Sequence, residues 1–223
     1  MESIEVKIMD NTLYKTMEFL KNIFLLNTIW LLMCIPIVTI FPATTAMFAV
    51  LREWKTQGDI QVLSAYIRFL KESFKQGFFI GIVWLVFTSL LLGDFIITNQ
   101  LNSNLKYVLF SFFFLLTIVY LFVTIMIFPV MAHYRVSWKG AIKNAFLLSV
   151  ANLHYTILSL LILAATILLC FYFPGATLLS FSMAAFLINA LVSRGFQRVN
   201  ETYTSEQTAE VSLGKLRTPA VRS

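Results

Sequence analysis

Only a few residues in this chain could do chemistry, and they stand apart from one another. Asp94 is embedded in an apolar run, and the next acidic residue along the chain is Glu201. A carboxylate inside a membrane-spanning helix is costly and marks, by default, a role such as proton or substrate handling. Asp94 comes just before the polar residues 98–100, so it can also reach interfacial water. We therefore expect Asp94 to anchor the end of its helix rather than to carry a proton.

Three more polar residues lie in or beside long apolar runs. Asn27 lies in the first such run, Asn189 lies in the last, and Arg194 follows the last. Amides at such positions usually form hydrogen bonds across helix interfaces, each contributing about 0.6 to 2 kcal/mol. We expect Asn27 and Asn189 to join helices, and we retain all three residues as candidate functional positions.

Two prolines interrupt apolar runs within the same tripeptide, Ile-Phe-Pro, which ends at Pro42 and again at Pro129. Each proline lacks an N–H and deprives the carbonyl four residues earlier, at Val38 or Ile125, of its helical donor. At each proline the helix must therefore kink or find another donor, and threonine hydroxyls are available near Pro42. Broken helices can line ion or substrate sites in transporters, but kinks without such a role are commoner. The repeated tripeptide also suggests an internal duplication.

The remaining reactive side chains form no recognisable catalytic or metal-binding pattern. Cys34 and Cys170 lie in apolar runs, where a thiol behaves as a small apolar group. His133 and His154 have no further ligand at metal-binding spacing. Nucleophile elbows, phosphate-binding loops and zinc-binding helices are absent from the sequence. We therefore expect neither enzymatic activity nor a bound cofactor or metal.

The amino-acid composition indicates that this protein lies in a lipid bilayer. Hydrophobic residues make up 59% of the 223 residues and charged residues 13%, against about 25% charged in soluble domains. A soluble fold of this size could not bury so much apolar surface. The same composition argues against a disordered chain, a disulfide-rich scaffold and a nucleic-acid-binding domain.

Four apolar runs are long enough for membrane helices, at residues 77–97, 105–133, 155–173 and 176–193. Residues 19–54 are too long for one upright helix and barely long enough for two. If they cross twice and turn near Pro36, every Lys and Arg except Lys106 falls on one side, which is then cytoplasmic. We predict an all-α polytopic membrane protein with about six transmembrane helices and both termini in the cytoplasm. A re-entrant hairpin in place of the first two crossings is the open alternative.

The two cytoplasmic connections of this topology are amphipathic. Apolar residues recur every three or four positions over residues 60–74 and 138–149, with basic residues on the other faces. Each pattern predicts an amphipathic helix on the cytoplasmic surface, which packs under the bundle or docks a partner. We expect residues 1–195 to form a single transmembrane domain and residues 196–223 a polar, disordered cytoplasmic tail.

Several short segments resemble a known family. Residues 25–32 read LLNTIWLL, residues 34–40 CIPIVTI, residues 43–46 ATTA, residues 69–76 FLKESFKQ and residues 92–95 LGDF. This pattern resembles the YesL-like family of bacterial integral membrane proteins, a domain of unknown function. The resemblance implies a bacterial plasma-membrane protein whose genes often sit near carbohydrate uptake and sensing genes. It implies no activity and no functional residues, and the family often has a glycine at the position of Phe41.

Two functional hypotheses follow. The first is a non-enzymatic accessory subunit that packs against a larger membrane complex, in a carbohydrate uptake or sensing system. The second is a small transporter or channel-like homo-oligomer, in which Pro42 and Pro129 line a path and Asp94 handles a cation or proton. We favour the first, because the apolar runs offer little chemistry. The expected partners are the lipid bilayer and a membrane transporter or sensor complex or a second copy of the chain, and not nucleic acid.

Overall fold

The computed structural model describes residues 2–58, 60–100, 105–134 and 137–196, with side chains from residue 13 onward. These residues form α-helices joined by short turns, without a β-strand among them, which confirms the all-α prediction. The elements are α1 (Glu2–Met33), η1 (Ile37–Thr39), α2 (Ile40–Gln57), α3 (Val62–Gln100), α4 (Leu105–His133), α5 (Trp138–Ala151), α6 (Leu153–Tyr172) and η2 (Pro174–Ala176), followed by a final helix at residues 177–196. The predicted tail at residues 196–223 lies outside the described residues except for Phe196, which is buried in the last turn of the final helix.

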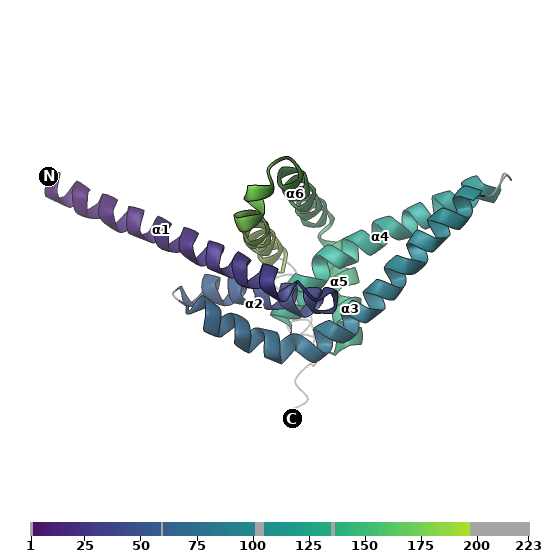
Figure 1. Cartoon of the computed structure of the whole chain (residues 1–223), viewed down its shortest axis with the longest axis horizontal. Coiled ribbons are helices and arrows are strands. Elements are labelled where there is room, and N and C mark those ends of the chain that lie inside the picture. Colours follow the sequence, from purple (N-terminus) through teal and green to yellow (C-terminus); the bar gives the residue numbers. More distant parts are fainter. Residues whose placement is uncertain (1, 59, 101–104, 135–136, 197–223) are drawn as a thin grey trace, which may run out of the picture.

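Within the described residues, four helical segments are long and apolar enough to cross a membrane. They are α3, α4, α6 and the segment Pro174–Phe196, which correspond to the four apolar runs of the sequence. Figure 1 shows α3 and α4 side by side in a long arm, with α6 and the final helix in a second hairpin. α1 and α2 are not among these segments, because charged residues extend to Lys21 in α1 and occupy the last third of α2. The sixfold crossing therefore stays a prediction.

The prediction of a separate amphipathic helix at residues 60–74 was wrong. α3 runs without interruption for 39 residues, or about 58 Å at 1.5 Å per residue, and joins the amphipathic stretch to the apolar run that follows. The chain has no capping residue or proline between Phe74 and Gly77 that would end a helix there. Figure 1 shows α3 bending partway along its length.

The second connection does form a helix of its own. Ser137 caps the start of α5, its hydroxyl accepting a hydrogen bond from the Gly140 N–H at 3.4 Å, and α5 ends at Ala151, just before Asn152. The buried face consists of Ala141, Ala145 and Ser149 and packs mainly against α4. The position of α5 at the cytoplasmic surface stays a prediction.

α2 is the central helix of the bundle. Nine of its residues are buried, in a nearly continuous stretch from Pro42 to Leu51. α2 packs most extensively against α3, then against α4 and α1. Small side chains such as Ala43, Ala46 and Ala49 let the neighbouring helices come close. The core of the protein is therefore built around α2 rather than around the more apolar α4.

The two prolines occupy different positions in their helices. Pro42 lies in the first turn of α2, where a missing N–H costs no helical hydrogen bond, so the predicted kink at Pro42 was wrong. Pro129 lies inside α4, one turn before its end. The tripeptides nevertheless meet, because the rings of Phe41 and Phe128 lie 5.2 Å apart. Their opposite places in the helices argue against a simple internal duplication.

The start of α2 packs against two glycines of α3, which lie four residues apart. A Cβ added to Gly77 would lie 2.8 Å from Pro42 Cα, and one added to Gly81 would lie 3.2 Å from Phe41 Cβ. Glycines at this spacing let two helix backbones approach closely in a membrane. The contact with Pro42 involves backbone, which cannot move aside as a flexible side chain can.

This contact yields a stability prediction. We expect Gly77→Ala to lower the free energy of unfolding by about 1 to 3 kcal/mol, because the new methyl group overlaps the backbone of α2. Gly93→Ala in the same helix is the matched control, since nothing lies within 4 Å of its added Cβ. Thermal unfolding in detergent measures both, and Gly93→Ala should unfold at or slightly above the wild-type temperature. Equal midpoints for the two variants would contradict the close contact.

Candidate functional site

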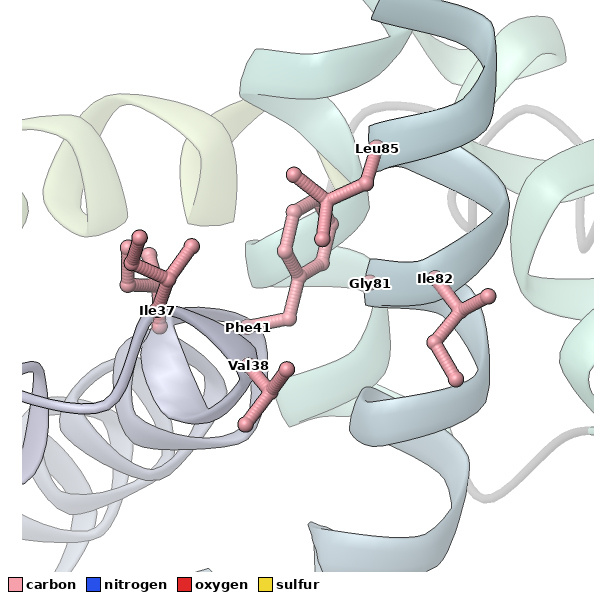
Figure 2. Close-up of a pocket in the computed structure, with 7 residues that line it drawn as sticks. Ile37, Val38, Phe41, Gly81, Ile82 and Leu85 are labelled. Atoms are coloured by element: carbon pink, nitrogen blue, oxygen red, sulfur yellow. The ribbon is translucent and has the colours of Figure 1, made fainter.

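An apolar pocket lies where η1 and the start of α2 face α3. It has a volume of about 60 Å³, and its lining residues are Ile37, Val38, Ile40, Phe41, Gly81, Ile82 and Leu85. Figure 2 shows the ring of Phe41 reaching across toward Leu85 and the backbone at Gly81. The lining contains no polar side chain. Such a pocket can accommodate a hydrocarbon group but offers nothing for acid–base or metal chemistry.

Beside this pocket, hydrogen bonds between side chains join α3 to α4. Trp84 Nε1 donates to Thr124 Oγ1 at 2.8 Å, and the hydroxyls of Thr88 and Tyr120 lie 2.6 Å apart. These polar groups satisfy one another in an apolar surrounding, where an unpaired hydroxyl would be costly. Sequence reasoning missed this cluster, although Trp84 and Thr88, which are one turn apart on α3, were a usable signal.

Asn27 is the best-connected of the predicted candidates. Its side chain is fully buried; Nδ2 donates to the Thr177 carbonyl at 2.7 Å, and Oδ1 accepts from the Ser182 N–H at 3.0 Å. The two backbone groups are more than one turn apart in the final helix. Next to this junction, the ring of Trp30 packs against the ring of Phe181, with the ring centroids 5.0 Å apart. The expectation that Asn27 joins helices thus has a direct structural counterpart.

Asn189 lies further along the final helix and is 2% exposed. Its Oδ1 and the hydroxyl of Ser159 are the buried side-chain polar atoms that have no hydrogen-bond partner within the described chain. Gly195 packs against Asn152 and Tyr155, and this antiparallel register brings Ser159 and Asn189 to the same level. α6 and the final helix therefore each carry one unsatisfied buried oxygen at a similar level of their hairpin.

Asp94 lies half-buried near the end of α3. Among the described residues, neither a hydrogen bond nor an ion pair joins its carboxylate to another group. Lys106, the nearest basic residue in the sequence, instead donates to the carbonyl and the Oδ1 of Asn99 at 3.2 and 3.1 Å. The pairing of Phe95 with Phe110 places Asp94 about five helical turns, or roughly 28 Å, from Pro129.

The remaining candidate, Arg194, is exposed near the end of the final helix. Its neighbour Ser193 accepts a hydrogen bond from Lys55 of α2 at 2.7 Å. The structure thus brings the Pro42 and Pro129 tripeptides together. The Asn27 side chain packs against the final helix, and Asn189 belongs to that helix. It leaves Asp94 and Arg194 apart from both pairs. Groups of three or more His, Cys, Asp or Glu residues able to hold a metal ion are absent from the described part of the chain.

The long apolar helices are those of a helical membrane protein, and comparison with known proteins finds a family that matches part of the chain. Residues 23–95 match the family described as "Protein of unknown function, DUF624". The match covers the last third of α1, all of α2 and most of α3, including the close contact at Gly77. The resemblance to the YesL-like family that was inferred from segments between residues 25 and 95 is confirmed by this match and by relatives of the same kind.

Its relatives in Bacillus subtilis (strain 168) are themselves described as uncharacterized. YesL is 26% identical over 82% of this chain and 89% of its own length. YteU is 29% identical over 67% of this chain and 68% of its own length. YesV is 26% identical over 61% of this chain and 68% of its own length. No solved structure matches the chain.

The Asn27 junction yields a second prediction. Asn27→Leu should lower the free energy of unfolding by about 1 to 3 kcal/mol, because it deprives the partly buried Thr177 carbonyl and the buried Ser182 N–H of this partner. Thr28→Val is the matched control, since the Thr28 hydroxyl bonds only within its own helix, to the Phe24 carbonyl at 2.9 Å. Thermal unfolding in detergent should show a lower midpoint for Asn27→Leu alone. Similar midpoints for both variants would show that the junction contributes little.

Proposed function

We propose that this protein is a non-enzymatic accessory subunit that packs laterally against a larger complex in the bacterial plasma membrane. The observation that carries this proposal is the α3–α4 arm, whose outer part packs mainly on itself and leaves large apolar side chains exposed. They include Phe95, Ile96, Ile97, Tyr107, Val108, Phe112, Phe114 and Leu115, each at least 57% exposed. Contiguous apolar surfaces of this kind mark membrane or protein contacts.

The chemistry of the spans supports the same proposal. The pocket is apolar throughout, and hydrogen bonds between α3 and α4 pair Trp84 with Thr124 and Thr88 with Tyr120. For the transporter hypothesis, Pro42 and Pro129 would have to line a path together with Asp94, but Asp94 lies near the opposite end of α4 from Pro129. We therefore rank transport second. The carbohydrate uptake or sensing system remains the context that the family resemblance implies.

The partner hypothesis is tested by purifying the tagged protein from its native membranes in a mild detergent. We expect a stoichiometric transporter or sensor subunit to copurify, and we expect Asp94→Asn to leave its recovery unchanged. Asp94→Glu, which keeps the carboxylate, is the control. A defined homo-oligomer without other subunits, whose flux in liposomes falls in Asp94→Asn but not in Asp94→Glu, would favour the transporter instead.

We also propose that α1 and α2 cross the membrane as a hairpin, with both termini in the cytoplasm. α2 has 18 residues, or about 27 Å at 1.5 Å per residue, which is close to the thickness of the hydrocarbon core. The turn at residues 34–36 carries no charge, whereas the opposite end of α2 carries Arg52 and Lys55. This asymmetry is typical of a hairpin that enters from the cytoplasm.

Cysteine labelling of intact cells tests this topology. In a chain that lacks both native cysteines, a membrane-impermeant maleimide should label Ile35→Cys from outside, because the side chain at this turn is 75% exposed. Gln57→Cys, at the far end of α2, should react only after the cells are opened. Labelling of both positions only in opened cells would indicate a re-entrant hairpin.

A further inference from the structure

Basic side chains from two helices meet at one end of the bundle. Arg52 of α2 donates a hydrogen bond to the Ala132 carbonyl in the last turn of α4, and Lys55 lies one turn further along α2. His133 follows Ala132 and lies within electrostatic reach of both Arg52 and Lys55. Lys55 Nζ also donates a hydrogen bond to Ser193 Oγ of the final helix, at 2.7 Å. We call Arg52, Lys55 and His133 the basic cluster.

The basic cluster has no acidic partner among the described residues. Glu53, the nearest carboxylate in the sequence, is engaged by Arg68 of α3. Like charges one turn apart on a helix repel each other. The end of α4 offsets this only in part, since a helix C-terminus carries about half a negative charge. An anion bound at the cluster would relieve the excess of positive charge.

The surroundings of the basic cluster correspond to the level of the lipid headgroups. Arg52 and Lys55 are exposed, so a ligand can reach them. The rings of His133 and Tyr134 pack against Phe196 at 5.0 and 5.5 Å, beside the ends of apolar helices. Tyrosines and tryptophans concentrate at the boundary between hydrocarbon and headgroups. This setting favours a lipid phosphate over a phosphate from solution.

We propose that the basic cluster binds a phosphate group, supplied by the headgroup of an anionic phospholipid. The Arg52 guanidinium has several N–H donors besides the one directed at Ala132, and its planar geometry suits paired hydrogen bonds to phosphate oxygens. Lys55 adds a compact positive charge beside it. The proposal depends on the membrane setting and not on the accessory role, so either can fail without the other.

Native mass spectrometry of the full chain in detergent, titrated with phosphatidylglycerol, tests this proposal. Arg52→Gln with Lys55→Gln should weaken retention of the lipid roughly tenfold. Lys71→Gln with Lys75→Gln is the matched control, because it removes the same charge from exposed positions of α3, and it should change retention less than about twofold. Equal losses in the two double variants would overturn the proposal, since they would indicate general attraction to a basic surface.

Two further measurements keep the test independent of folding and of the phosphate source. Arg52→Lys with Lys55→Arg keeps both charges and should keep lipid retention, whereas loss of retention in this folded variant would overturn the site. Inorganic phosphate should neither displace the lipid nor raise the thermal midpoint of the wild type. If it does both in the wild type but not in Arg52→Gln with Lys55→Gln, the phosphate site stands and the lipid source is wrong.

Discussion

The close approach of α2 to Gly77 of α3 is the constraint on which the rest of the structure depends. An added methyl group there would lie 2.8 Å from the backbone of Pro42, so the start of α2 has one position available to it. That position buries α2 along most of its length and makes it a surface on which α1 and α4 pack. Lipid tails are as apolar as leucine side chains, so close packing rather than the hydrophobic effect must hold these helices together.

Polar groups supply the specificity that apolar packing cannot. Trp84 with Thr124 fixes the pairing of α3 and α4, and Asn27 ties the first helix to the final helix across most of the sequence. The polar atoms of the Trp84–Thr124 pair and of the Asn27 amide all have hydrogen-bond partners. Ser159 and Asn189 are the exception, which makes the hairpin of α6 and the final helix the part of the bundle least specified by its own hydrogen bonds.

Much of the fold could be predicted from the sequence because the apolar runs are long and their ends are marked by polar residues. The bounds of α4 agree with the prediction residue for residue, and those of α6 and the final helix agree within three positions, whereas α3 begins 15 residues before the predicted run. The prediction failed where local signals are weak. No residue near Phe74 ends a helix, so one helix replaces the two expected, and Pro42 begins a helix that it was expected to bend.

The candidate site was harder to predict, because its contacts are not local. Asn27 was chosen as a lone amide in an apolar run, but nothing in its sequence neighbourhood identifies the final helix as its partner. The spacing of the glycines at residues 77 and 81 is typical of a close contact between helices. The spacing alone does not indicate which helix packs there. The sequence therefore indicates which residues require partners, and the fold decides the pairing.

The distribution of features along the bundle bears on function. The exposed aromatic residues of the α3–α4 arm lie toward its tip, and the basic cluster lies at the other end of α4, beside Tyr134. Asp94 lies near the tip, about 28 Å from the proline tripeptides, and has no charged partner among the described residues. A pathway for an ion would need polar groups at intermediate depths. The polar side chains at those depths in α3 and α4 are instead bonded to each other, as Thr88 and Tyr120 are, or to a carbonyl of their own helix, as Ser89 and Thr117 are. Contacts at the surface, with lipid phosphate at one end and with apolar partners along the arm, therefore explain more of this arrangement than chemistry inside it does.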